Sequence, residues 1–133
     1  MRQRISPWVL PAAVVDFRER IESTDNEHII YWEAKIQPND FVTWLIKCDM
    51  PIVLSKISFS EKTLQSRCLG IREIQIGNIS KFYQDTPVRL DRVYSGILPS
   101  EILNPSMYAR IRFKNSGKKW HRIVATMRCR VLK

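Results

Sequence analysis

Apolar and polar side chains alternate along much of this chain, a pattern typical of β-strands with one buried face. The clearest run is residues 28–36, HIIYWEAKI, in which Ile30, Trp32, Ala34 and Ile36 share one phase. The same reasoning predicts further strands over three ranges: residues 52–57, 71–76 and 88–97. The pattern therefore predicts a chain built mainly from short strands, with Trp32 in the core.

One N-terminal segment has helical spacing instead. Val14, Phe17 and Ile21 recur at intervals of three and four, with charged residues between them. This spacing predicts a short amphipathic helix over residues 12–22.

A second helix is predicted after Ser60, because Ser60 can cap residues 61–69 and Gly70 can close the last turn. The spacing of apolar residues over residues 41–48 fits a helix and a strand equally. Their β-branched and aromatic composition favours a strand, with Trp44 in the core. Gly77 and Asn78 predict a turn.

The chain ends in two more alternating segments, residues 107–114 and 120–132, separated by the turn sequence NSGKK. Gly117 in that turn is available for a positive φ. We predict a C-terminal β-hairpin in which the apolar faces match, with Ile111 opposite Ile123 and Arg112 opposite Arg122. The matched set is completed by Ala109 opposite Ala125, Met107 opposite Met127, and Lys114 opposite Trp120.

The fold class expected from these elements is a β-rich single domain, mainly β or α+β. It would be an antiparallel sheet or sandwich of about six or seven short strands with one or two short helices. The 133 residues, 44% of them apolar, suit one globular domain over residues 12–133. Residues 1–11 are predicted to form an extended arm, because Pro7 and Pro11 interrupt them.

The charge is distributed unevenly. The chain carries a net charge of +9, yet all 13 acidic residues precede Met107, and the segment from Met107 to Lys133 holds nine Lys or Arg. Such a segment produces a local positive potential that attracts polyanions. Its outward face on the predicted hairpin would gather cations without a neighbouring acid, which is unfavourable unless an anion covers it.

We therefore predict that this face binds nucleic acid, with guanidinium groups on phosphates and Tyr108 and Trp120 stacking on bases. The predicted binding residues are Arg110, Arg112, Lys114, Lys118, Lys119, Arg122, Arg128, Arg130, Tyr108 and Trp120. Two other interpretations are open. The arginines can pair internally with Glu33, Glu73, Asp85 or Asp91, or they can form a solvated face that only aids solubility.

Catalytic and metal-binding patterns are absent from the sequence. His28 and His121 lie far apart with no local Asp or Cys partner, and the glycines are isolated. Cys48, Cys68 and Cys129 lack metal-ligand spacing and are expected to be buried, reduced thiols. We expect a protein that is not an enzyme and that uses no cofactor, metal or small-molecule substrate.

The N-terminal arm exposes Trp8, Val9 and Leu10, which we expect to mediate self-association into a homo-oligomer. No signal peptide and no apolar run of spanning length is visible in the sequence. The expected location is intracellular, in the cytoplasm or nucleus, or in a virion.

In general character the chain is similar to small structural or accessory proteins of RNA viruses: compact, poor in glycine, β-rich, basic, and bearing an apolar arm. That resemblance rests on no motif. It implies a self-associating basic protein that binds single-stranded nucleic acid, RNA first, or a nucleocapsid. The alternatives are a matrix-type assembly protein on an anionic membrane and a protein-interaction module with internally paired arginines.

Overall fold

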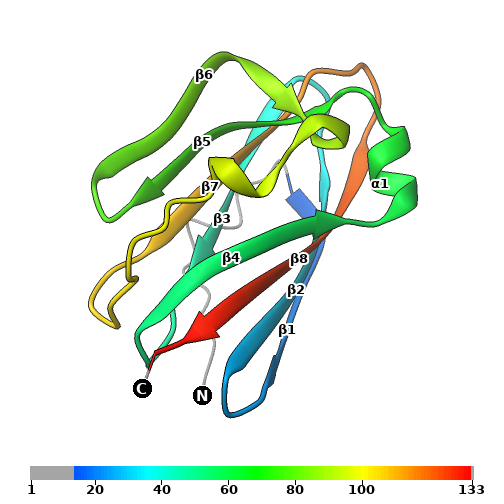
Figure 1. Ribbon diagram of the computed structural model, residues 1–133. Helices are drawn as coiled ribbons and strands as arrows, with labels where there is room; N and C mark the ends of the chain where they lie inside the picture. The colour runs from blue at the N-terminus through cyan, green and yellow to red at the C-terminus, as the bar shows by residue number, and fades with distance from the viewer. Residues whose placement is uncertain (1–13, 133) are drawn as a thin grey trace.

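The computed structural model describes residues 14–132 and shows two antiparallel sheets packed face to face (Figure 1). Each sheet contains one of the two C-terminal strands, β7 or β8, and is named after it. The β8 sheet has the order β1-β2-β8-β4, formed by Val14–Ser23, Glu27–Ile36, His121–Val131 and Ile52–Phe59. The β7 sheet has the order β3-β7-β5-β6, formed by Asp40–Ile46, Ala109–Asn115, Leu69–Ile76 and Ile79–Arg89. The expected β-rich fold is confirmed, in its sandwich form.

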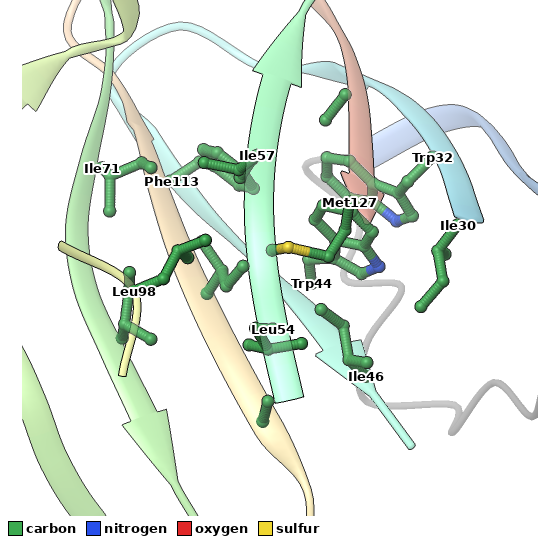
Figure 2. Close-up of a cluster of buried hydrophobic side chains, with 14 of the residues drawn as sticks. Ile30, Trp32, Trp44, Ile46, Leu54, Ile57, Ile71, Leu98, Phe113 and Met127 are labelled. Carbon is green, nitrogen blue, oxygen red and sulfur yellow. The ribbon is translucent and has the colours of Figure 1, made fainter. Parts of the chain in front are cut away.

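The core lies between the sheets and is built from the inward phase of each strand. Strand β2 alternates half-buried and buried positions along its whole length, as its sequence predicts. Trp32 stacks on Trp44 with ring centroids 5.1 Å apart, and on Phe113 at 5.5 Å. Figure 2 shows these rings and Met127 converging from β2, β3, β7 and β8. Both tryptophans are in the core, as predicted.

The chain crosses repeatedly between the two sheets. From β2 onward the order follows a jelly-roll scheme, in which β2, β8 and β4 face β3, β7, β5 and β6. The strand that would continue beyond β4 is reduced to one bridge, in which the Leu103 N–H donates to the Ile52 carbonyl at 2.7 Å. This topology gives β7 and β8 interior positions, so each has strands on both sides.

The two predicted terminal strands are confirmed, and each buries the face that its alternation indicates. Their predicted register is wrong, however. Ile111 is in register with Trp44 and Ile74, and Ile123 with Ala34, because β7 and β8 belong to opposite sheets. Their apolar faces meet across the core instead of lying side by side. The predicted contacts between Ala109 and Ala125, Met107 and Met127, Arg112 and Arg122, and Lys114 and Trp120 as strand partners are wrong for the same reason.

Asn115 organises the crossing from β7 to β8. It is fully buried, and its side-chain amide donates to the carbonyls of Ile36 at 3.0 Å and Lys119 at 2.9 Å. Its carbonyl oxygen accepts from the Gly117 N–H at 2.9 Å. Gly117 does not have a positive φ. A Cβ added at Gly117 would lie 2.9 Å from the Cys68 sulfur, so only glycine lets the backbone pass this close to Cys68.

The helix predicted over residues 12–22 is wrong for the described part of that range, because Val14–Ser23 forms strand β1, paired with β2. A β-bulge between Val15 and Arg18 interrupts the regular register of this strand, so its sequence lacks the strict alternation that would mark it as a strand. Residues 41–48 were predicted as a strand, and β3 confirms this for Asp40–Ile46.

Ser60 caps a helix as predicted, with the Thr63 N–H donating to its hydroxyl at 3.2 Å. The helix α1 covers only Glu61–Gln65. Gly70 therefore does not end it and lies in β5, where an added Cβ would be 2.9 Å from Pro87. The turn at Gly77 is confirmed, with φ of 60°.

The strand predicted over residues 88–97 is largely wrong. Strand β6 ends at Arg89 and is followed by short 3-10 helices at Leu90–Arg92 and Ser95–Ile97. Most of β6 was missed because it is an edge strand whose side chains are mostly exposed, so it lacks the alternation that marks a strand with a buried face.

Candidate functional site

The basic terminal segment is divided between the two outer faces of the sandwich. Because β7 and β8 lie in facing sheets, their outward phases point in opposite directions. Arg110, Arg112 and Lys114 lie on the outside of the β7 sheet, whereas Arg122, Arg128 and Arg130 lie on the outside of the β8 sheet. Lys118, Lys119 and Trp120 are exposed in the connection between them. The single cationic face predicted from a hairpin is therefore wrong.

On the outer face of the β8 sheet, two of the three arginines from the terminal segment pair with carboxylates. An Arg122 nitrogen lies 2.8 Å from a Glu33 oxygen, and an Arg128 nitrogen lies 2.9 Å from a Glu27 oxygen. Both acids come from the adjacent strand β2. The expectation of internal pairing is thus confirmed for Arg122 with Glu33. Asp91 pairs with Arg89 instead, whereas Glu73 and Asp85 form no ion pair within residues 14–132.

The outer face of the β7 sheet has a different chemistry, centred on Phe41. The Arg112 guanidinium lies 4.5 Å from the centre of the Phe41 ring, and the Lys114 ammonium lies 4.3 Å from it. Arg72 approaches the same ring at 5.6 Å from strand β5. Three cations from two strands therefore surround one aromatic ring of a third strand, through cation–π contacts.

Two tyrosines extend this arrangement. The Arg72 guanidinium donates to the Tyr83 hydroxyl at 2.7 Å and lies 5.2 Å from the ring centre. Tyr108 is approached by Lys47 at 5.0 Å and by Arg110 at 5.7 Å. We call the whole set the basic-aromatic face, defined as Phe41, Tyr83, Tyr108, Lys47, Arg72, Arg110, Arg112 and Lys114.

No cation of the basic-aromatic face has a carboxylate within ion-pair distance among the described residues. Lys114 instead donates to the Asn39 side-chain oxygen at 3.1 Å, and Arg110 donates to the Gly77 carbonyl at 2.5 Å. Because the acceptors of these two hydrogen bonds are neutral, the positive charges of Lys114 and Arg110 are not offset. Among the described residues, the five cations of the basic-aromatic face therefore keep their charge unpaired, whereas Arg122 and Arg128 on the β8 sheet are paired with carboxylates.

A small hollow of about 90 Å³ interrupts the basic-aromatic face. It is lined by Thr43 from β3, Arg110 and Arg112 from β7, and Glu73 and Gln75 from β5. The Gln75 amide donates to one Glu73 carboxylate oxygen at 3.1 Å. Glu73 is also in register with Arg112 on one side and Tyr83 on the other. One carboxylate thus shares this hollow with two arginines.

A larger hollow of about 640 Å³ lies beside β1 and is lined by Arg18, Glu19, Arg20, Tyr31, Trp32, Glu33 and Val124. It mixes both signs of charge. The Glu19 carboxylate in it accepts a hydrogen bond from the Trp44 indole N–H at 3.0 Å, which ties β1 to the core. It lacks the excess of cations that distinguishes the basic-aromatic face.

The histidines and buried cysteines lie apart from both hollows. His28 is 3% exposed, and burial lowers the pKa of its ring. Burial likewise raises the pKa of Cys48 to about 12 and that of Cys129 further. Cys48 and Cys129 are buried as predicted, whereas Cys68 is half-buried, and all three are free thiols. Within residues 14–132, no cluster of three or more His, Cys, Asp or Glu is arranged to hold a metal ion.

Sequence reasoning found Tyr108, Arg110, Arg112 and Lys114 of this face but missed the members from β3, β5 and β6. Phe41 carried a signal, since it lies in the outward phase of a strand that otherwise buries its aromatic side chain. Arg72 and Tyr83 carried no such signal, because register shifts in the β5–β6 pair interrupt the alternation that would show which way their side chains point. The predicted self-association residues Trp8, Val9 and Leu10 lie outside the described residues.

Comparison with protein-family models, with curated proteins and with solved structures finds no match to this chain. Within the described part of the chain, no helix has both the length and the apolar character needed to cross a membrane.

Proposed function

We propose that this protein binds single-stranded nucleic acid, RNA first, through the basic-aromatic face. The observation that carries the proposal is the placement of Arg112, Lys114 and Arg72 around the Phe41 ring, with no carboxylate paired to any of them. Cations that track a phosphate backbone, combined with aromatic rings for bases, form the usual composition of a single-strand site. No catalytic step is part of this proposal.

The geometry favours single strands over duplexes. Stacking on Phe41, Tyr83 or Tyr108 requires bases whose faces are free, which a paired helix does not offer. The rings of Phe41 and Tyr83 come from β3 and β6, and that of Tyr108 from the residue just before β7, so a single-stranded nucleic acid lying across the sheet could contact several of them. A base that stacks on Phe41 would displace a long cationic side chain towards the neighbouring phosphate, where its charge is better used.

The test compares two double variants of equal charge change. Arg112→Gln with Lys114→Gln removes two cations from the basic-aromatic face, and Arg122→Gln with Arg128→Gln removes two from the paired β8 face. Binding of a labelled single-stranded RNA is followed by fluorescence anisotropy across a salt series. Melting curves show whether each variant stays folded.

We expect the wild-type protein to bind with an affinity that falls linearly as log salt rises. The Arg112 and Lys114 variant should weaken binding and reduce the magnitude of the slope by about 1.4, from about 0.7 per lost phosphate contact. The matched control should leave the slope unchanged. Equal weakening by both variants would overturn the assignment of the face, and no RNA binding by the wild-type protein would overturn the function.

The two other candidate partners, an anionic membrane and another protein, are tested alongside RNA. Vesicles containing phosphatidylserine replace the RNA in a parallel flotation experiment, in which a matrix-type protein would bind through exposed aromatic side chains and anionic headgroups. Binding to vesicles and not to RNA would move the proposal to a membrane surface. Binding to neither would favour a protein-interaction module.

Self-association through Trp8, Val9 and Leu10 stays a prediction from the sequence. Light scattering on the full chain and on a chain lacking residues 1–11 tests it. An oligomer that persists without those residues would show that the arm is not its cause.

A further inference from the structure

The hollow in the basic-aromatic face contains one carboxylate, Glu73, beside Arg110 and Arg112. Glu73 is half-buried, and no cation of residues 14–132 lies within ion-pair distance of it, although Arg112 is its partner in register. A carboxylate repels the phosphates that the surrounding cations attract. On a surface for nucleic acid, such a group is costly unless it accepts hydrogen bonds from the ligand.

The neighbours of Glu73 leave it able to accept such bonds. Gln75 donates to one carboxylate oxygen at 3.1 Å, which fixes the orientation of the group. An ionised carboxylate has about four lone-pair sites on two oxygens, so acceptor capacity remains on both. Arg110 and Arg112 line the same hollow and supply donors beside it. The hollow thus presents acceptors and donors next to each other.

We propose that this hollow reads guanine, so that the protein prefers single-stranded nucleic acid with a guanine at one position. The inference rests on the proposed function. The Watson–Crick edge of guanine carries two adjacent donors, N1–H and the 2-amino group, next to the O6 acceptor. The two donors match the Glu73 carboxylate, and O6 matches a guanidinium of Arg112 or Arg110.

The other bases match this arrangement less well. Adenine and cytosine each offer one amino group beside ring acceptors, and uracil offers one N–H between two carbonyls. Each would place an acceptor against the Glu73 carboxylate and leave a carboxylate oxygen without a new donor. A site built to hydrogen-bond particular groups discriminates strongly against ligands that lack them, because its own polar groups then stay unpaired.

A purely structural role for Glu73 makes a different prediction. If the carboxylate only offsets repulsion between Arg110, Arg112 and Arg72, its loss would lower the melting temperature and would change the affinity for every RNA by the same factor. Base preference separates the two roles, since a structural carboxylate has no means of telling one base from another.

The experiment uses uridine oligonucleotides of nine residues in which only the central base varies, as guanine, adenine, cytosine or inosine. With the full-length wild-type protein we expect guanine to bind about tenfold more tightly than adenine or cytosine. Inosine, which lacks the 2-amino group, should fall between them. In Glu73→Gln, the ratio of Kd values between adenine and guanine oligonucleotides should fall to about one.

Glu33→Gln is the matched control, because Glu33 lies on the opposite outer face, and it should keep the wild-type ratio. Equal affinities for all four oligonucleotides, with salt-dependent binding intact, would overturn guanine reading and leave the proposed function standing. A preference that survives Glu73→Gln would overturn the role of the hollow. No binding to any oligonucleotide would overturn both.

Discussion

Arg112 and Arg122 lie on opposite outer faces of the sandwich, although only nine residues separate them in the chain. Arg112 is in register with Thr43 and Glu73, and its guanidinium lies over the Phe41 ring. Arg122 is in register with Lys35 and pairs with Glu33. Arg112 has no carboxylate within ion-pair distance among residues 14–132, whereas Arg122 has much of its charge offset by Glu33. The two faces therefore provide matched test and control positions within one segment.

Phe41→Leu should weaken binding of single-stranded RNA by about 5- to 150-fold, because stacking on an aromatic ring is worth about 1–3 kcal/mol per base. The fold should persist, since Phe41 points away from the core. Tyr31→Leu is the control. The Arg20 guanidinium lies 4.1 Å from the centre of the Tyr31 ring, but this pair belongs to the β8 sheet. Anisotropy measures both variants. Equal losses in the two would argue against stacking on Phe41.

His28 should make the protein sensitive to acid. Burial lowers the pKa of His28 in the folded state below its ordinary value of 6.5, although Asp49 opposes this shift. Between the two pKa values, His28 is therefore protonated in the unfolded chain and neutral in the folded chain. As a result, this contribution to stability is fully present above pH 6.5 and is lost as pH falls towards the folded-state pKa, by at most about 1.4 kcal/mol per pH unit.

Urea denaturation between pH 8 and pH 5 measures this dependence. In His28→Leu, the decrease in unfolding free energy between pH 6.5 and the onset of carboxylate titration should disappear. An unchanged decrease in that variant would assign the acid sensitivity to other groups.

Asn115→Ala should destabilise the protein by about 2–4 kcal/mol, because it removes the partner of the Ile36 and Lys119 carbonyls and of the Gly117 N–H. Asn115→Asp should cost at least as much, since a carboxylate cannot donate to those carbonyls. The exposed neighbour provides the control, and Ser116→Ala should stay within about 0.5 kcal/mol of wild type. Urea denaturation gives all three values; a small effect of Asn115→Ala would mean that water replaces the lost bonds.

The three cysteines should differ in reactivity towards a thiol-disulfide reagent. Burial raises the pKa of Cys48 to about 12, and Cys129 is fully buried, so neither forms a thiolate readily at neutral pH. Cys68 is half-buried and should react first. We expect one fast equivalent in the native protein and three in urea. Cys68→Ser should abolish the fast reaction; a fast reaction that remains would show that the core opens.

The sequence predicted the faces of individual strands well. Alternation placed Trp32 and Ile123 inward and Arg112 and Arg122 outward, and the structure agrees. It could do so because successive side chains of a strand point to opposite faces, which is a property of the local backbone. The alternation was unreadable where a bulge shifted the phase, in β1, or where both faces were exposed, in β6.

The sequence by itself determined a β-rich domain, the inward side of most strands, and the concentration of positive charge after Met107. The tertiary structure alone decided which strands are neighbours. A strand's pattern states that one face is buried but does not state against what, so matching apolar faces suit a hairpin and a sandwich equally well. That choice sent β7 and β8 into opposite sheets, paired Arg122 with Glu33, and brought Phe41, Arg72 and Tyr83 beside Arg112.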